Sequence, residues 1–170
     1  SVIENVEFHE NIQIGEDSLF CIQACKNIKS VYILNEPLYN YKLNRNSAIR
    51  KYDKEFVNKC LLSMKVAKEY IEKEYKENKE VIKRINNYIS YHILIISVNY
   101  CFNNDNNLNY KEQINQIKRI CETPEIRYAI QHSSYDGLTL KKRISLFTMK
   151  FRFYFLTMII AKIRQKQLKK

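Results

Sequence analysis

From residue 53 onward, apolar side chains recur every three or four positions, which is the spacing of α-helices with one buried face. Asp53 is a suitable N-cap for the first helix, whose apolar stripe comprises Phe56, Cys60, Met64, Ala67 and Ile71. A second stripe predicts another helix and comprises Val81, Ile85, Tyr88, Ile89, His92, Ile93, Ile96 and Tyr100. Residues 72–80 between the stripes are polar, so we expect the chain to bend there.

Turn signals divide the rest of this region. The Asn-rich residues 103–109 predict a loop, and the next helix carries Ile114, Ile117, Ile120 and Cys121. Thr123-Pro124-Glu125 is typical of a helix start, because Thr can cap and Pro fits the first turn. That helix should end near His132, and Thr139 is the predicted cap of a last helix that runs nearly to the end.

The first 52 residues show a mixed pattern. Leu19, Ile22, Cys25 and Ile28 are at helical spacing, which predicts a helix over 18–28 with Asp17 as its N-cap. Two β-rich stretches follow, at 30–34 and 38–43. We therefore expect a mainly α chain of the α+β class, with a small α/β part over 1–52 and a helical domain over 53–170. Only two Gly and two Pro occur in 170 residues, which also favours helices.

The net charge of +11 and a pI near 9.4 indicate affinity for something anionic: nucleic acid, an acidic membrane surface or a phosphorylated substrate. The alternative is that the charge only keeps helix faces solvated. Five scattered cysteines without a CxxC predict reduced thiols rather than a zinc site, and we expect Cys21 and Cys25 to be buried. No signal peptide is visible, and the apolar run 153–161 is too short to cross a bilayer.

The tetrad Gly15-Glu16-Asp17-Ser18 opens the first predicted helix with two adjacent carboxylates. Together with the preceding Phe8-x-Glu10-x-Ile12-x-Ile14 and the later Glu36-Pro37-Leu38-Tyr39-Asn40-Tyr41-Lys42 and Asn46-Ser47-Ala48-Ile49, it resembles the end of the catalytic domain of bacterial family 2 glycosyltransferases of the GT-A type. The resemblance covers about the first third of the chain.

The resemblance implies roles for individual residues. Asp17 would be the base that takes the proton of an acceptor hydroxyl, with inversion at the sugar carbon, and Glu16 would orient the acceptor or support the local backbone. Tyr41, Lys42, Arg45 and Ser47 are candidates for substrate binding, through ring stacking and stabilisation of a phosphate leaving group. Family members usually have Arg where this chain has Lys42, which weakens a phosphate-clamping role. The alternatives remain that Asp17 only caps a helix, that Tyr41 packs in a sheet, and that Ser47 begins a turn.

The four Asp residues stand at 17, 53, 105 and 136, so no Asp-x-Asp motif is present, and neither is a Gly-rich phosphate loop. We therefore expect this chain to be the C-terminal part of a longer transferase, to hold no metal or cofactor itself, and to be inactive alone. The resemblance implies that the whole enzyme uses a nucleotide-sugar donor, Mg²⁺ or Mn²⁺ and a sugar or lipid-linked acceptor. Its products would be bacterial cell-surface polysaccharides or glycoconjugates.

Residues 141–170 mix Phe, Ile and Leu with Lys and Arg. Such a segment can lie on an anionic membrane, or it can pack internally. A peripheral position on the cytoplasmic side of the membrane would follow from the first alternative. Two rivals to a transferase are a basic helical module that binds nucleic acid, although no specific recognition motif is present, and a non-catalytic membrane-docking domain.

Overall fold

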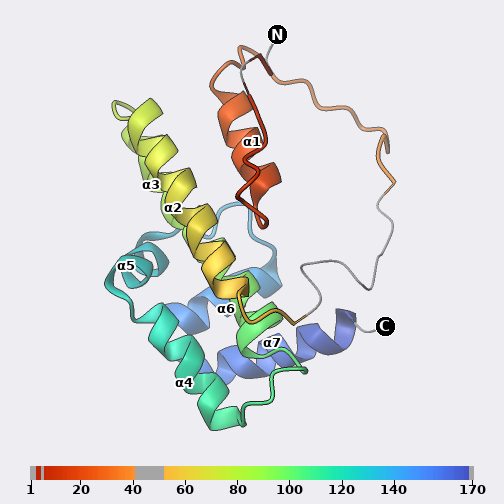
Figure 1. Ribbon diagram of the computed structural model, residues 1–170, viewed down its shortest axis with the longest axis vertical. Coiled ribbons are helices and arrows are strands. Elements are labelled where there is room, and N and C mark those ends of the chain that lie inside the picture. The colour runs from red at the N-terminus through yellow and green to blue at the C-terminus, as the bar shows by residue number, and fades with distance from the viewer. Residues whose placement is uncertain (1–2, 5, 41–51, 169–170) are drawn as a thin grey trace.

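The computed structural model describes residues 3–4, 6–40 and 52–168. In this part of the chain it contains helices and no strand (Figure 1). The elements in chain order are α1 (Glu16–Cys25), α2 (Phe56–Glu74), α3 (Lys79–Ile96), the π-helix η1 (Ser97–Cys101), α4 (Tyr110–Cys121), α5 (Pro124–His132), α6 (Leu140–Lys150) and α7 (Tyr154–Leu168).

Helices α2 and α3 form a hairpin that runs through the middle of the molecule (Figure 1). The predicted stripe of α2 is buried in full, and most of the α3 stripe is buried as well, so both predictions are confirmed. The side chain of Asn78 caps α3 by accepting a 3.1 Å hydrogen bond from the amide of Val81. At its other end α3 continues directly into η1.

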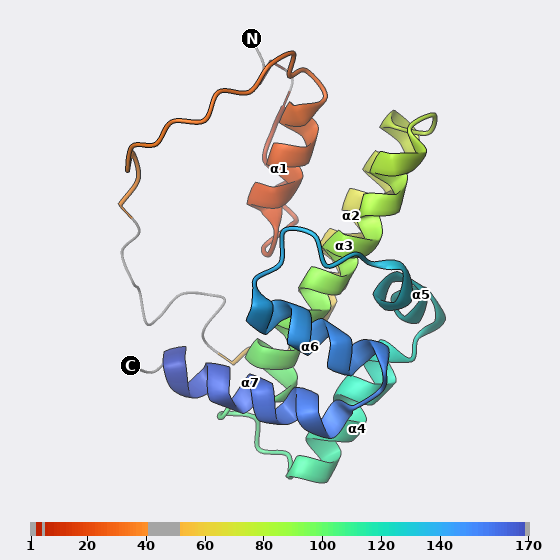
Figure 2. The ribbon, with the colours of Figure 1, turned by 180° about the vertical axis from the view of Figure 1, so that it is seen from behind.

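Helices α4 to α7 surround the lower half of this hairpin (Figure 2). Helix α4 begins with a capping box between Asn109 and Glu112, and α5 begins at Pro124 as predicted. The guanidinium of Arg127 on α5 donates to the carbonyls of Met149 and Lys150 at 2.9 and 2.6 Å. It thereby satisfies acceptors at the end of α6 that have no partner within that helix.

The prediction of one continuous last helix is wrong. The chain breaks between α6 and α7 at Arg152, which has a left-handed backbone conformation with φ of 61°. The amide of Phe153 donates to the carbonyl of Thr148 at 2.7 Å, and that of Arg152 donates to Met149 at 3.2 Å. This pair of bonds is a Schellman motif, which ends a helix more often with Gly than with Arg. Because the left-handed position is occupied by Arg152 rather than by Gly, the sequence gives no signal for this helix end.

Helix α1 packs on α2, and the predicted helix there is confirmed with different ends. Its N-cap is Gly15, so Asp17 lies inside the first turn and the prediction of Asp17 as N-cap is wrong. Cys21 and Cys25 are exposed rather than buried, because α1 buries a narrower face that contains Leu19 and Ala24. Before α1, Ile12 and Ile14 bury their side chains in the same core.

Residues 30–40 are extended without forming a strand, and they run away from the helices in both views (Figures 1 and 2). Val31, Tyr32 and Ile33 are at least 77% exposed. A strand needs a neighbouring strand to pair its backbone groups, and none is present among the described residues. The α/β part is thus not seen; the rest of the second stretch, 41–43, lies outside the described residues.

Candidate functional site

The start of α1 is seated on the α2–α3 hairpin through Gly15. This residue has φ of 83°, a left-handed conformation that favours glycine. A Cβ atom at this position would lie 2.7 Å from Ser63 Oγ and 3.0 Å from His92 Nε2. Glycine is therefore required here both for the turn and for the close approach of the backbone to α2 and α3.

Ser63, Tyr88 and His92 form the polar surface that Gly15 meets, and we refer to them as the Tyr88 cluster. The hydroxyls of Ser63 and Tyr88 are 2.8 Å apart, and the rings of Tyr88 and His92 have centroids 4.4 Å apart. His92 Nδ1 lies 3.1 Å from the Tyr88 carbonyl. Because a carbonyl can only accept, Nδ1 carries the proton, and in the neutral ring Nε2 is left as an acceptor that faces Gly15.

The electrostatics of the Tyr88 cluster connect it to the acidic pair. Burial lowers the pKa of His92, while the hydrogen bond to the backbone of Tyr88 and the negative charge of Asp17 act in the opposite direction. Burial raises the pKa of the Tyr88 hydroxyl against the opposing effect of its hydrogen bond with Ser63, and the charges of Asp17 and Glu16 act in the same direction as burial. The Tyr88 cluster is thus uncharged at neutral pH and lies within electrostatic reach of both carboxylates.

Glu16 and Asp17 are the first two residues of α1. Asp17 is exposed, and its Oδ1 accepts hydrogen bonds from the amide and the hydroxyl of Ser18 at 2.6 and 3.3 Å. Glu16 is half-buried. Both carboxylates lie beside the free backbone amides of the first helical turn. Asp17 is therefore accessible and held where it can accept a proton from a bound hydroxyl.

The structure brings together only two of the six predicted site residues, Glu16 and Asp17. The other four, Tyr41, Lys42, Arg45 and Ser47, lie outside the described residues, so their roles remain predictions. The Tyr88 cluster was missed from the sequence, where Tyr88 and His92 were assigned to an apolar helical stripe. A signal was present, since these two polar-tipped side chains stand four residues apart on one buried face.

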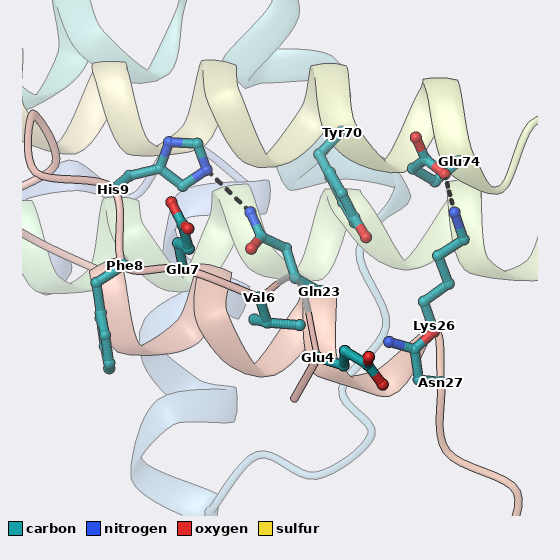
Figure 3. A pocket seen from close by; sticks show the side chains of 10 residues that line it. All are labelled: Glu4, Val6, Glu7, Phe8, His9, Gln23, Lys26, Asn27, Tyr70 and Glu74. Atoms are coloured by element: carbon teal, nitrogen blue, oxygen red, sulfur yellow. Dashed lines mark hydrogen bonds and ion pairs between the residues drawn. The ribbon is translucent and has the colours of Figure 1, made fainter. Parts of the chain in front are cut away.

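A cavity of about 510 Å³ lies further along α1, and neither Glu16 nor Asp17 contributes to it (Figure 3). In it the amide of Gln23 donates to His9 Nε2 at 2.9 Å, and Lys26 forms an ion pair with Glu74 of α2. Its lining carries three carboxylates against one Lys, which is a poor environment for a nucleoside diphosphate. The lining residues are Glu4, Val6, Glu7, Phe8, His9, Gln23, Lys26, Asn27, Tyr70 and Glu74.

Among the described residues, no group of three or more His, Cys, Asp or Glu side chains could hold a metal ion. The same part of the chain contains no helix that is both long and apolar enough to span a bilayer.

Comparison with known proteins gives one informative match. The chain is 28% identical over 155 residues to a Bacillus subtilis (strain 168) protein described as "Uncharacterized glycosyltransferase EpsJ". This similarity supports a glycosyltransferase relationship. The alignment covers 89% of this chain but 44% of the Bacillus protein, so the chain spans less than half the length of that relative. No family model matches the chain, and no solved structure matches it.

Proposed function

We propose that this chain supplies the acceptor-activating part of an inverting family 2 glycosyltransferase of the GT-A type, with Asp17 as general base. The observation that carries the proposal is the exposed carboxylate of Asp17 in the first turn of a helix that Gly15 anchors on the Tyr88 cluster. The similarity to a protein described as a glycosyltransferase supports the same reaction class. Glu16, half-buried beside Asp17, would support the local backbone or orient the acceptor.

The proposed step is a single displacement. The acceptor hydroxyl oxygen forms a bond to the anomeric carbon, the bond from that carbon to the nucleoside diphosphate breaks, and the hydroxyl proton moves to Asp17. The diphosphate leaves with the electron pair of the broken bond. Lys42 and Arg45 would stabilise its charge, while Tyr41 and Ser47 would contact the sugars. The acceptor would be a sugar or a lipid-linked sugar, in the synthesis of a bacterial cell-surface polysaccharide or glycoconjugate.

The donor would be held elsewhere in the whole enzyme. The sequence contains no Asp-x-Asp motif and no Gly-rich phosphate loop, and we propose that the nucleotide-sugar and its Mg²⁺ or Mn²⁺ are held by a part of the enzyme outside these 170 residues. The 170-residue chain by itself is then expected to be inactive. Residues 1–52 would complete the catalytic domain and 53–170 would form the helical domain, on the cytoplasmic side of the membrane.

The exposed segment 30–40 supports this division. Val31, Ile33 and Leu38 are each more than 70% exposed, and Leu34 is 55% exposed. Extended backbone with such side chains is suited to join a sheet that another part of the enzyme provides, which would form the α/β part expected from the sequence.

The test is Asp17→Asn in the complete enzyme. We expect turnover to fall by about 10²- to 10⁴-fold, as is typical for loss of a general base, with donor affinity unchanged. Transfer from a panel of nucleotide-sugars and donor binding by calorimetry would be measured in parallel. Asp105→Asn is the matched control, because Asp105 is an exposed carboxylate in the loop before α4. Turnover of Asp17→Asn within a few-fold of the parent would contradict the assignment.

A further inference from the structure

The positive charge of the chain is concentrated at its C-terminal end. Ten of the 29 Lys and Arg residues follow Gly137, and none of the 18 Asp and Glu residues does. Nearly all of the net charge of +11 therefore belongs to the last 33 residues, most of which form α6 and α7. The remainder of the chain is close to neutral. The excess of positive charge is therefore not a general property of the solvent-exposed helix faces of this chain.

The same two helices carry apolar stripes that face solvent. On α6 and its C-cap, Leu140, Ile144, Phe147 and Phe151 are spaced by four, three and four residues and are 46–73% exposed. On α7, Phe155, Leu156, Ile159 and Ile163 are 40–59% exposed. At these spacings each set lies on one side of its helix. The opposite sides are buried, through residues such as Met149 and Ala161.

The turn at Arg152 connects the two stripes. The rings of Phe147 and Phe151 have centroids 4.6 Å apart, and those of Phe151 and Phe153 are 6.3 Å apart. Phe153 is itself 49% exposed. We call the two stripes together with Phe153 the α6–α7 face. Both helices lie side by side at the front of the molecule in Figure 2.

Basic side chains are placed at the margins of the α6–α7 face. Lys141 and Arg143 are exposed on either side of the α6 stripe, and Lys166 is exposed where the α7 stripe ends. Long basic side chains can keep their charge at a polar surface while their stems extend along apolar material. Acidic side chains, which an anionic surface would repel, are absent from both helices.

We propose that the α6–α7 face binds an anionic lipid bilayer, with both helices in the plane of the interface. Exposed Ile and Leu beside Phe fit acyl chains, and the basic margin fits anionic headgroups. Nucleic acid fits less well, because five of the nine side chains of the face are aliphatic and, unlike the four Phe rings, give bases no ring to stack on. This proposal concerns where the chain binds and is independent of the sugar-transfer chemistry at Asp17.

The first experiment is co-sedimentation of the whole chain with phosphatidylcholine vesicles, with and without phosphatidylserine, at low and high salt. We expect binding to the anionic vesicles that weakens as salt screens the charges. Phe151→Ser with Phe155→Ser should weaken binding by about tenfold or more, because two exposed rings no longer insert. Lys141→Gln with Arg143→Gln should also weaken it by about tenfold. Lys76→Gln with Lys83→Gln is the matched charge control, on exposed residues at the far end of the α2–α3 hairpin, and should bind as the parent does.

A second measurement tests the same proposal without a double variant, in case a double variant folds poorly. The chain has no Trp, so Phe151→Trp introduces a single fluorescent reporter. Its emission should shift to the blue on addition of anionic vesicles, whereas Tyr32→Trp, in the exposed extended segment, should not respond.

Three results would overturn the proposal. The first is equal binding by the Phe double variant and the parent. The second is a blue-shifted Phe151→Trp spectrum before vesicles are added, which would show that protein covers the face. The third is tighter binding to mixed-sequence RNA than to anionic vesicles, which would favour a nucleic-acid partner.

Discussion

Gly15 and Arg152 both have left-handed backbone conformations, with φ of 83° and 61°, but their surroundings differ. Gly15 is enclosed by the Tyr88 cluster, which leaves no room for a side chain. Arg152 is 59% exposed, and its side chain forms two hydrogen bonds to the carboxylate of Glu122 at 2.9 and 3.0 Å. The same backbone conformation is thus imposed by close packing at one site and stabilised by an ion pair at the other. Substitutions at the two sites should therefore differ in effect.

The largest effect is expected from Gly15→Ala. The new methyl group would add left-handed strain and would force Ser63 to rotate away from Tyr88, so we expect a loss of about 2–3 kcal/mol of stability. Displacement of Glu16 and Asp17 should also reduce turnover of the complete enzyme by about 10²-fold, since catalysis depends on position at this scale. Urea unfolding and transfer assays would measure the two losses.

Gly137→Ala is the control for strain alone. Gly137 has φ of 69°, and nothing lies within 4 Å of the position a Cβ would take. We expect a loss of about 1 kcal/mol and no effect on turnover. Equal losses at the two glycines would contradict the close approach of Gly15 to the Tyr88 cluster. Ser63→Ala combined with Gly15→Ala should recover part of the loss, because the nearest atom to the new methyl group is removed.

A smaller effect is expected from Glu122→Gln at the second site. Hydrogen bonding from Arg152, together with that from the Tyr154 hydroxyl at 2.5 Å, lowers the pKa of Glu122 to about 2 against partial burial. A lowered pKa means that the stabilising interaction is fully present above the unfolded pKa, near 4.5, and is lost as pH falls toward about 2. We expect a loss of about 1–2 kcal/mol at neutral pH, after allowance for solvent screening.

Urea midpoints of the parent and Glu122→Gln should converge as the pH is lowered through this window. Glu77→Gln, at an exposed position in the turn before α3, is the matched control and should track the parent throughout. A difference that stays constant with pH would mean that the charge of Glu122 does not contribute.

The smallest effect is expected from Arg152→Gly. Glycine relieves about 1 kcal/mol of left-handed backbone strain, and loss of the exposed ion pair with Glu122 acts in the opposite direction. The net change in unfolding free energy should be within about 0.5 kcal/mol, while the pKa of Glu122, followed by NMR titration, should rise. A stability loss as large as that of Glu122→Gln would show that Arg152, rather than Tyr154, provides most of the stabilisation.

Regular parts of the fold could be predicted from the sequence, and interactions between distant segments could not. The stripes of α2 and α3 follow from local periodicity, and Pro124 marks the start of α5. The Arg side chain at the break is paired with Glu122, thirty residues earlier, so a window of neighbouring residues carries no sign that a residue other than Gly is stabilised there. The wrong N-cap at Asp17 has the same origin, because the role of Gly15 depends on its contact with α2 and α3.

The candidate site was predicted in part for a related reason. Glu16 and Asp17 are adjacent in the sequence and belong to a motif, so a resemblance could identify them. Ser63 and His92 come from two different helices, and only the fold brings them to Gly15. The strand predicted over 30–34 shows the opposite failure, in which a local pattern predicts an element that does not form. Residues with high β-propensity form a strand only beside another strand, and the described residues contain none.

The π-helix η1 has a mechanical consequence. Its wider turn leaves the Val98 carbonyl available, and Gln165 of α7 donates to that carbonyl at 2.6 Å. Helix α7 is thereby fastened to the same continuous rod, α3 with η1, that carries His92 against Gly15. His92 and Val98 are six residues apart, or about 9 Å along a helix axis. Helix α7 and the turn that bears Asp17 are therefore both positioned by contacts with this one rod.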